Sequence, residues 1–139
     1  MKVKFSKGAT EDAYNVRKTV FIDEQKFKLD KDEIDDRAYH VVIYDDETPI
    51  ATARCFNKKD KEDEYIIGRV AVLRKYRGLK IGRELIILLE DKIRELNGKS
   101  VELSAQLRIK DFYKKLGYVE YGDIFYDEYC EHVKMKKIL

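Results

Sequence analysis

Six cations and two glycines gather between Arg69 and Arg83, directly before an apolar helix pattern that continues to Leu96. The segment contains no acidic residue, so it should attract phosphate. The first turn of a helix has unpaired backbone N–H groups and the positive end of the helix dipole. Glycine there lets a ligand come close to the backbone. The segment from Arg77 to Gly82 therefore predicts a binding site for a small phosphate-bearing ligand at a helix start.

The composition excludes several other classes of protein. The chain has 139 residues, of which 44% are hydrophobic and 40% are charged, and this is typical of one folded domain covering residues 1–139. It has no apolar run of the roughly 20 residues needed to cross a bilayer, and its first residues lack the apolar core of a signal peptide. Two cysteines are too few for a disulfide scaffold. We expect a cytoplasmic protein with no membrane partner and no bound metal.

Hydrophobic patterns predict the elements that would position the phosphate loop. Thr10 can cap a first helix, and a strand from about Tyr65 to Val72 leads into the loop. The long helix after Gly82 should end at Asn97-Gly98. The remaining predicted elements are strands at 3–5, 39–44, 50–56 and 101–105, a strand pair at 118–121 and 132–138, and a short helix at 111–116. Residues 26–37 are predicted as a charged loop or broken helix, and residues 57–64 as a polar loop.

Two blocks of the sequence resemble the GNAT N-acetyltransferase superfamily. Val70-Ala71-Val72 followed by Arg77–Gly82 is similar to the family's Arg/Gln-x-x-Gly-x-Gly/Ala loop for the pyrophosphate of coenzyme A. Leu103–Gln106 followed by Phe112–Tyr118 is similar to the strand and helix that close the family's site. Their order and spacing carry the resemblance, because each block alone would be a weak signal.

Further segments resemble the small, ElaA-like bacterial branch of that superfamily. They are Arg17–Gln25, Ala51–Arg54 and the ending from Phe125 through Glu128 and His132 to Met135. The resemblance implies an α/β (α+β) acyl-CoA N-acyltransferase fold, with a mixed central sheet of about six to seven strands flanked by about four helices. It also implies that two central parallel strands, holding residues 70–72 and 101–105, splay apart to admit a thioester.

The resemblance implies acetyl-CoA as cosubstrate. Backbone amides of the loop would bind the pyrophosphate together with the cationic side chains, and a backbone N–H near Ala71 would stabilise the developing oxyanion. The residues implied to bind the cofactor are Val70, Ala71, Val72, Arg77, Gly78, Leu79, Lys80, Ile81, Gly82, Arg83, Ser104, Phe112 and Tyr113. Two of them depart from the family pattern. Lys80 replaces a glycine, which we expect to be accommodated by helical backbone with the side chain reaching a phosphate, and Ser104 stands where many relatives carry Asn.

Amine attack on a thioester requires two proton transfers. Tyr113 matches the family's acid position and would protonate the departing thiolate, although an aromatic core residue has the same pattern. Glu64 stands near the start of the strand that leads to Val70, where some relatives place a glutamate base. It is equally the last acid of a solvated run from Asp60. The catalytic prediction is therefore Tyr113 with Glu64.

The acceptor pocket is implied to involve Glu24, Gln25, Arg54, Arg69 and Gln106. An arginine in an apolar strand needs a partner, so we expect Arg54 and Arg69 to pair with Glu24, Glu64 or an acidic group of the substrate. The two histidines have no metal-ligand spacing. We expect His40 to be a hydrogen-bonded core residue and His132 to have a structural or pocket-lining role.

These observations predict transfer of an acetyl group to a primary amine of a small molecule or peptide. Two alternatives remain: a coenzyme A-binding module without turnover, and an acyl-homoserine-lactone-synthase-like acyltransferase, which the block around Arg17 and Phe21 also resembles. Nucleic-acid binding through the basic cluster is not expected, because the aromatic residues form no stacking ladder. The acceptor has no motif in the sequence, and the protein could be a monomer or a homodimer.

Overall fold

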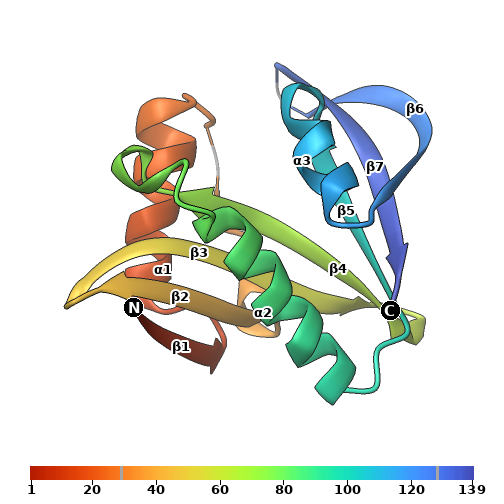
Figure 1. Cartoon of the computed structure of the whole chain (residues 1–139), viewed down its shortest axis with the longest axis horizontal. Coiled ribbons are helices and arrows are strands. Elements are labelled where there is room, and N and C mark those ends of the chain that lie inside the picture. Colours follow the sequence, from red (N-terminus) through yellow and green to blue (C-terminus); the bar gives the residue numbers. More distant parts are fainter. Residues whose placement is uncertain (29, 128) are drawn as a thin grey trace.

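Seven strands form one sheet in the order β1-β2-β3-β4-β5-β7-β6 (Figure 1). The computed structural model describes residues 1–28, 30–127 and 129–139, so Glu128 of the branch-like ending lies outside the described residues. Neighbouring strands are antiparallel except for β4 and β5, which are parallel. The strands are β1 Lys2–Lys7, β2 Tyr39–Asp45, β3 Thr48–Lys58, β4 Lys61–Val72, β5 Ser100–Gln106, β6 Val119–Asp127 and β7 Cys130–Ile138.

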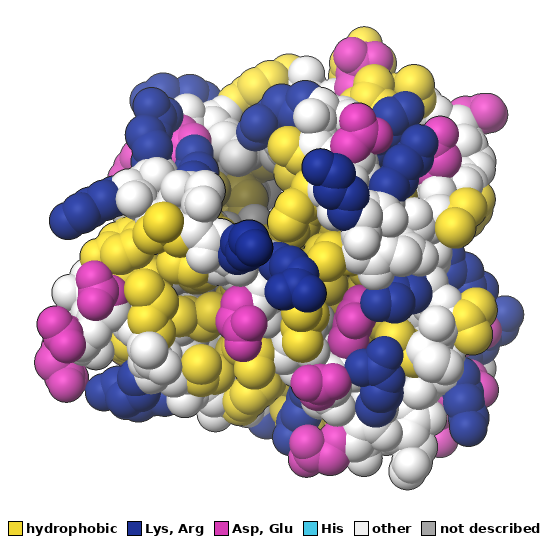
Figure 2. Space-filling view, viewed as in Figure 1, with side chains coloured by type: hydrophobic (Ala, Val, Ile, Leu, Met, Phe, Trp, Pro, Cys, Tyr) yellow, Lys and Arg dark blue, Asp and Glu magenta, His cyan; other side chains and the backbone are white. Residues whose placement is uncertain are grey.

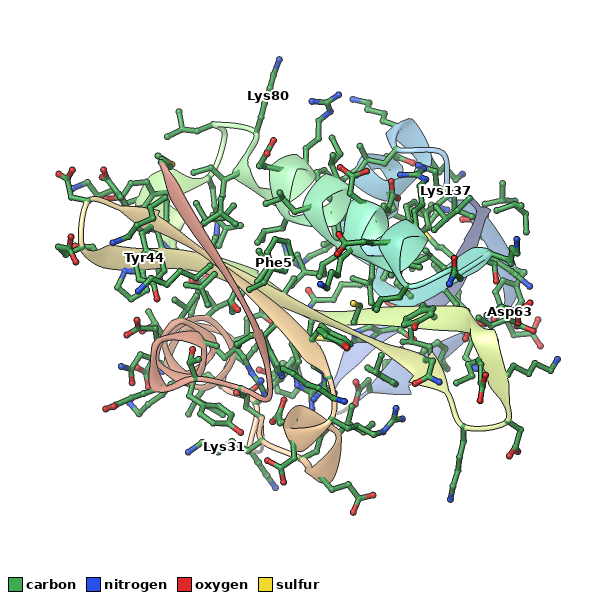
Figure 3. The ribbon with its side chains drawn as sticks, turned by 90° about the horizontal axis from the view of Figure 1, so that it is seen from below. Phe5, Lys31, Tyr44, Asp63, Lys80 and Lys137 are labelled. Carbon is green, nitrogen blue, oxygen red and sulfur yellow. The ribbon has the colours of Figure 1, made fainter. Side chains whose placement is uncertain are left out.

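Helices cover both faces of this sheet. Helix α1 (Glu11–Arg17), which continues as the π-helix η1 (Lys18–Glu24), lies on one face, and α2 (Ile81–Glu95) lies on the other (Figures 1 and 3). Helix α3 (Lys110–Lys115) lies on the same side as α2, beside β5. Short 3₁₀ turns complete the described helices: η2 Glu33–Asp36, η3 Arg74–Tyr76 and η4 Leu107–Ile109.

The packing of α2 follows from its sequence. Leu85, Leu89 and Ile93 recur every four residues, lie on one stripe of the helix and are fully buried against the sheet. Burial of each such side chain contributes about 1.5–3 kcal/mol. The predicted helix signals are also confirmed: the Thr10 hydroxyl accepts a hydrogen bond from the Ala13 amide at 3.3 Å, and the helix that starts at Ile81 ends before Asn97-Gly98.

The two central parallel strands separate, as the family resemblance implied. Strands β4 and β5 pair only from Glu64 to Ile67. Beyond that point β4 contains a bulge, because two residues, Arg69 and Val70, lie opposite one residue of β3. Arg69 adopts a left-handed conformation with φ 51°. A bulge bends its strand and increases its twist, so the end of β4 turns away from β5. The predicted mixed sheet with splayed central strands is confirmed.

One loop prediction requires correction. Residues 57–64 do not form a loop, because β3 and β4 continue as a hairpin with its turn at residues 59–60. The sequence pattern did not reveal these strand ends because their side chains are charged. Strand residues that are exposed on both faces of a sheet do not alternate between apolar and polar types. Residues 26–37, predicted as a charged loop or broken helix, contain the short 3₁₀ turn η2, which has a capping box between Asp32 and Asp35 and agrees with that prediction. Among the described residues, no helix combines the length and apolar character needed to cross a bilayer.

Candidate active site

A cavity of about 1000 Å³ lies where β4 and β5 separate. Figure 2 shows the hollow in this face of the molecule, with Lys and Arg side chains gathered beside it. Most of the predicted site residues line it: Gln25, Arg54, Arg69, Val70, Ala71, Val72, Arg77, Gly78, Lys80, Ile81, Gly82, Arg83, Ser104, Gln106, Phe112 and Tyr113. Glu24, Glu64 and Leu79 do not line this cavity. The splayed strands thus bring segments distant in sequence to one site.

The loop before α2 is a left-handed turn and not an early helical turn. Lys80 has φ 64° and ψ 19°, so the expectation that its backbone is helical is wrong. This conformation is the one that glycine adopts without steric cost, which accounts for glycine at this place in the family pattern. The Lys80 side chain points away from the molecule (Figure 3). Leu79 is 61% exposed and lies outside the cavity lining, so its side chain does not contribute to the predicted site.

The start of α2 opens directly into the cavity. The Glu84 amide makes a helical hydrogen bond to the Lys80 carbonyl, so the amides of residues 81–83 precede the helical ladder. A Cβ atom at Gly82 would lie 3.4 Å from the Phe112 ring and 4.0 Å from Val72. Glycine therefore keeps a narrow passage open between the helix start and the two walls of the cavity.

Arg77 is held by Glu24 and by the end of β4. Its two terminal nitrogens donate to the Glu24 carboxylate at 2.6 and 2.8 Å, and its Nε donates to the Val72 carbonyl at 2.9 Å. The hydrogen bonds from Arg77 lower the pKa of Glu24. Glu24 therefore connects η1 to the basic loop. Its carboxylate is directed to Arg77 and the residue does not line the cavity, so this structure adds no support to its predicted place in the acceptor pocket.

Tyr113 lies on α3 and is 5% exposed. Its ring packs edge-on against Phe112 and Tyr118, with centroids 4.9 and 6.0 Å away. Among the described residues its hydroxyl has no hydrogen-bond partner, although the side chain lines the cavity. Burial raises the pKa of Tyr113 far above its ordinary value. The hydroxyl thus stays protonated at neutral pH and can donate to a group in the cavity.

Glu64 does not reach the cavity. It lies opposite Ser100 in the paired part of β4 and β5, where its carboxylate is 3.2 Å from Lys58 Nζ and 3.4 Å from Lys61 Nζ. Figure 3 shows the neighbouring Asp63 well separated from Lys80. Donation from Lys58 lowers the pKa of Glu64, which makes the carboxylate a weaker base. The structure therefore does not bring Glu64, the predicted catalytic base, to the cavity, because the splay begins after Ile67, beyond this residue.

Three arginines and three aspartates form an ion-pair network beside the cavity. Four of them (Arg17, Asp30, Asp35 and Arg54) are buried, and the side chains of Arg69 and Asp32 are about one-third exposed. Arg17 donates to Asp30 Oδ2 at 2.9 Å and to Asp35 Oδ1 at 2.7 Å. Arg54 donates to Asp35 Oδ1 at 2.7 Å and binds both carboxylate oxygens of Asp32, at 2.6 and 2.8 Å. The remaining arginine, Arg69, donates to the Asp30 carbonyl at 3.0 Å and to Asp32 Oδ2 at 3.3 Å.

This network corrects the expected pairing of Arg54 and Arg69 with Glu24 or Glu64. Their partners come from residues 30–35, a segment that the charge pattern alone presented as a solvated loop. The sequence did contain a signal for this pairing. Three aspartates, at positions 30, 32 and 35, lie close together in the chain and could neutralise arginines in apolar elements. Burial alone would raise the pKa of Asp35, but donation from Arg17, the Asp32 amide and Arg54 outweighs it and holds the pKa far below its ordinary value.

His132 and Gln106 face each other across β7 and β5 at the open end of the sheet, and both line the cavity. Gln106 donates to Gln25 Oε1 at 2.9 Å and so bridges β5 to the end of η1. His132 is 6% exposed, its Nδ1 lies 3.0 Å from the Cys130 carbonyl, and its ring stacks on Phe125. Because a carbonyl can only accept, Nδ1 carries the proton, and Nε2 of the neutral ring keeps its lone pair. His40, by contrast, is buried against the Asp35 carbonyl, as expected of a core residue.

Comparisons with known proteins agree with this geometry. The uncharacterized N-acetyltransferase YjcF of Bacillus subtilis is 31% identical over 91% of each chain, and the protein ElaA of Escherichia coli is 27% identical over 88% of this chain and 82% of its own. The crystal structure of ElaA superposes with a TM-score of 0.85 at 22% identity, over 98% of this chain and 99% of that one. An acyl-CoA N-acyltransferase of Pseudomonas aeruginosa also gives 0.85, at 23% identity over 98% of both chains. The model of the acetyltransferase (GNAT) domain matches residues 9–139. The chain therefore belongs to the GNAT acetyltransferase family, which confirms the predicted family and class of enzyme.

Proposed function

We propose that the protein transfers the acetyl group of acetyl-CoA to a primary amine by direct attack within a ternary complex. The observation that carries this proposal is the cavity between β4 and β5, which joins a basic helix start to a buried tyrosine hydroxyl. An acyl-CoA carries both groups, because its pantetheine arm joins a pyrophosphate to the thioester. Family membership supports an acyl-CoA cosubstrate, and acetyl is the acyl group that we propose.

The pyrophosphate would lie at the start of α2. The amides of residues 81–83 and the exposed guanidinium of Arg83 line this end of the cavity. Because Arg77 is already bound to Glu24, we assign it to holding the loop in place. The helix dipole and the amides then supply much of the positive potential at the phosphates.

The thioester would lie along the free edge of β4. Beyond Ile67 this strand has no partner on its β5 side among the described residues, so main-chain groups of residues 70 and 71 can pair with the pantetheine arm. A backbone N–H at this edge can donate to the carbonyl oxygen as it becomes an oxyanion. One donor of this kind is worth about 3 kcal/mol of activation free energy.

Tyr113 and His132 would handle the two protons. Tyr113 stays protonated at neutral pH and can donate to the departing thiolate. His132 lines the same cavity, and its Nε2 can accept a proton when Nδ1 donates to the Cys130 carbonyl. Glu64 lies outside the cavity lining and so is not available as the base there. We assign to His132 Nε2 the proton that the amine loses during attack.

A thiol-release assay tests the proposal. The protein is mixed with acetyl-CoA and a panel of primary amines, and free coenzyme A is followed with a thiol reagent. We expect release that rises linearly with enzyme concentration for at least one amine. The alternative, a binding module without turnover, predicts calorimetric binding of acetyl-CoA with no release above the uncatalysed rate for any amine, and that result would overturn the proposal.

A further inference from the structure

The acceptor side of the cavity contains hydrogen-bond donors that the protein itself does not satisfy. Arg54 is 3% exposed, and its Nε is buried without a hydrogen-bond partner among the described residues. Arg69 is about one-third exposed; its Nε and Nη2 donate to the residue 30–32 segment, but Nη1 donates to no described residue. A buried polar group without a partner costs about 1–3 kcal/mol. Such a cost is expected where a ligand later supplies the missing acceptor.

Open space lies beside these donors. Gly68 is the direct cross-strand neighbour of Arg54, so the two residues face the same side of the sheet. A Cβ atom at Gly68 would meet nothing within 4 Å. Arg54, Gly68 and Arg69 all line the cavity. The bulge at Arg69, with its left-handed backbone, turns this side chain toward the same opening.

The charges around Arg69 favour an added anion. Burial and the like charge of Arg54 lower the pKa of Arg69, and the attraction of Asp32 and Asp30 does not offset them. Asp30 also lines the cavity: its Oδ2 accepts from Arg17 Nε, whereas its Oδ1 lies 3.2 Å from Arg69 Nε and is buried without a hydrogen-bond partner among the described residues. A carboxylate above Gly68 would supply acceptors to Arg54 Nε and Arg69 Nη1, which have none among the described residues.

From this geometry we infer that the acceptor is a compact amino acid, whose carboxylate lies over Gly68 and binds Arg54 Nε and Arg69 Nη1 while its amine faces the thioester. This inference rests on the proposed function. Residues 68 and 69 precede Ala71 by two to three positions, or about 7–10 Å of strand. A small amino acid spans that distance when a hydrogen bond of about 3 Å is allowed at each end. The rings of Phe21, Phe27 and Phe56 would enclose its carbon skeleton.

Binding of product analogues tests the inference without turnover. N-acetylated amino acids with apolar, polar and acidic side chains, and the carboxamide of each, are titrated calorimetrically into the protein loaded with coenzyme A. We expect at least one carboxylate to bind roughly tenfold or more tightly than its carboxamide. Equal affinities in every pair, or no binding of any carboxylate, would overturn the inference.

Three variants sharpen the test. Arg69→Gln removes the charge, and Gly68→Val fills the open space without changing charge; both should abolish the preference for carboxylate over carboxamide. Arg94→Gln removes an exposed arginine on α2 outside the cavity lining and should retain the preference. A preference that survives both cavity variants would contradict the inference. If only amines without a carboxylate were acetylated, this inference would be contradicted but the proposed function would stand. If carboxylates bound but no amine were acetylated, only the proposed function would be contradicted.

Discussion

Replacement of Asp35 by asparagine should destabilise the protein more than an ordinary substitution. The Asp35 side chain is fully buried and accepts hydrogen bonds from Arg17 Nη1 at 2.7 Å, Arg17 Nη2 at 3.0 Å, Arg54 Nη1 at 2.7 Å and the Asp32 amide at 3.1 Å. Asparagine keeps the size of the side chain but loses the charge. It also presents an NH₂ group to donors, which leaves at least one guanidinium hydrogen bond unmade.

The magnitude follows from the burial of the partner. Arg17 is fully buried, so Asp35→Asn leaves an incompletely compensated charge inside the protein. Removing one partner of a buried ion pair costs about 3–5 kcal/mol. A domain of ordinary stability has about 5–15 kcal/mol in total. With a urea m-value of about 2 kcal/mol/M, the unfolding midpoint should fall by about 1.5–2.5 M.

Urea denaturation followed by circular dichroism measures this change, with Asp36→Asn as the matched control. Asp36 is exposed and adjacent to Asp35 in the same 3₁₀ turn, so its replacement should change the unfolding free energy by no more than about 0.5 kcal/mol. If Asp35→Asn cost less than about 1 kcal/mol, the network would not hold the segment as the structure indicates, and the reasoning would be refuted.

The remaining predictions concern pH and the chemistry of the cavity. The pKa values of Asp32 and Asp35 are lowered in the folded protein, so the stability that these carboxylates contribute is fully present above their unfolded-state pKa near 4 and is lost as the pH falls toward their folded-state pKa values. The urea midpoint should therefore fall steeply below about pH 4, and less steeply in Asp35→Asn. Parallel plots of midpoint against pH for the two proteins would contradict this. Tyr113→Phe should lower kcat by about 100-fold or more at unchanged acetyl-CoA affinity, whereas equal turnover would exclude the acid role. For Gly82→Val, a branched side chain between the helix start and Phe112 should weaken coenzyme A binding about tenfold or more; an unaltered calorimetric affinity would count against the proposed phosphate position. His132→Gln should reduce kcat by about 100-fold or more at unchanged acetyl-CoA affinity, and equal turnover would exclude His132 as the base.

Local patterns were sufficient to predict the parts of this protein that depend on neighbouring residues in the chain. The apolar repeat of α2, the Thr10 cap and the glycine-rich basic loop are short-range features, because helix periodicity and backbone freedom are decided within a few residues. The resemblance of the blocks around Val70 and Tyr113 to a known family then predicted the mixed sheet and the splay of its central strands.

Long-range pairing could not be predicted in the same way. The partners of Arg54 and Arg69 lie 19 to 39 positions away along the chain, and an acidic segment has the same composition whether it is solvated or buried. Glu64 was plausible as a base because it precedes Val70 on the strand that leads to the phosphate loop. The register of β4 against β5 instead places Glu64 where the two strands are still paired, before they separate.

The sequence by itself thus determined which residues begin the phosphate-binding helix, because that property is local to one turn of backbone. Only the tertiary structure decided which acids neutralise the buried arginines and which side chains face the open end of the sheet. Those choices depend on strand register and on a single bulge at Arg69. A shift of one residue would reverse the face that every side chain beyond it presents.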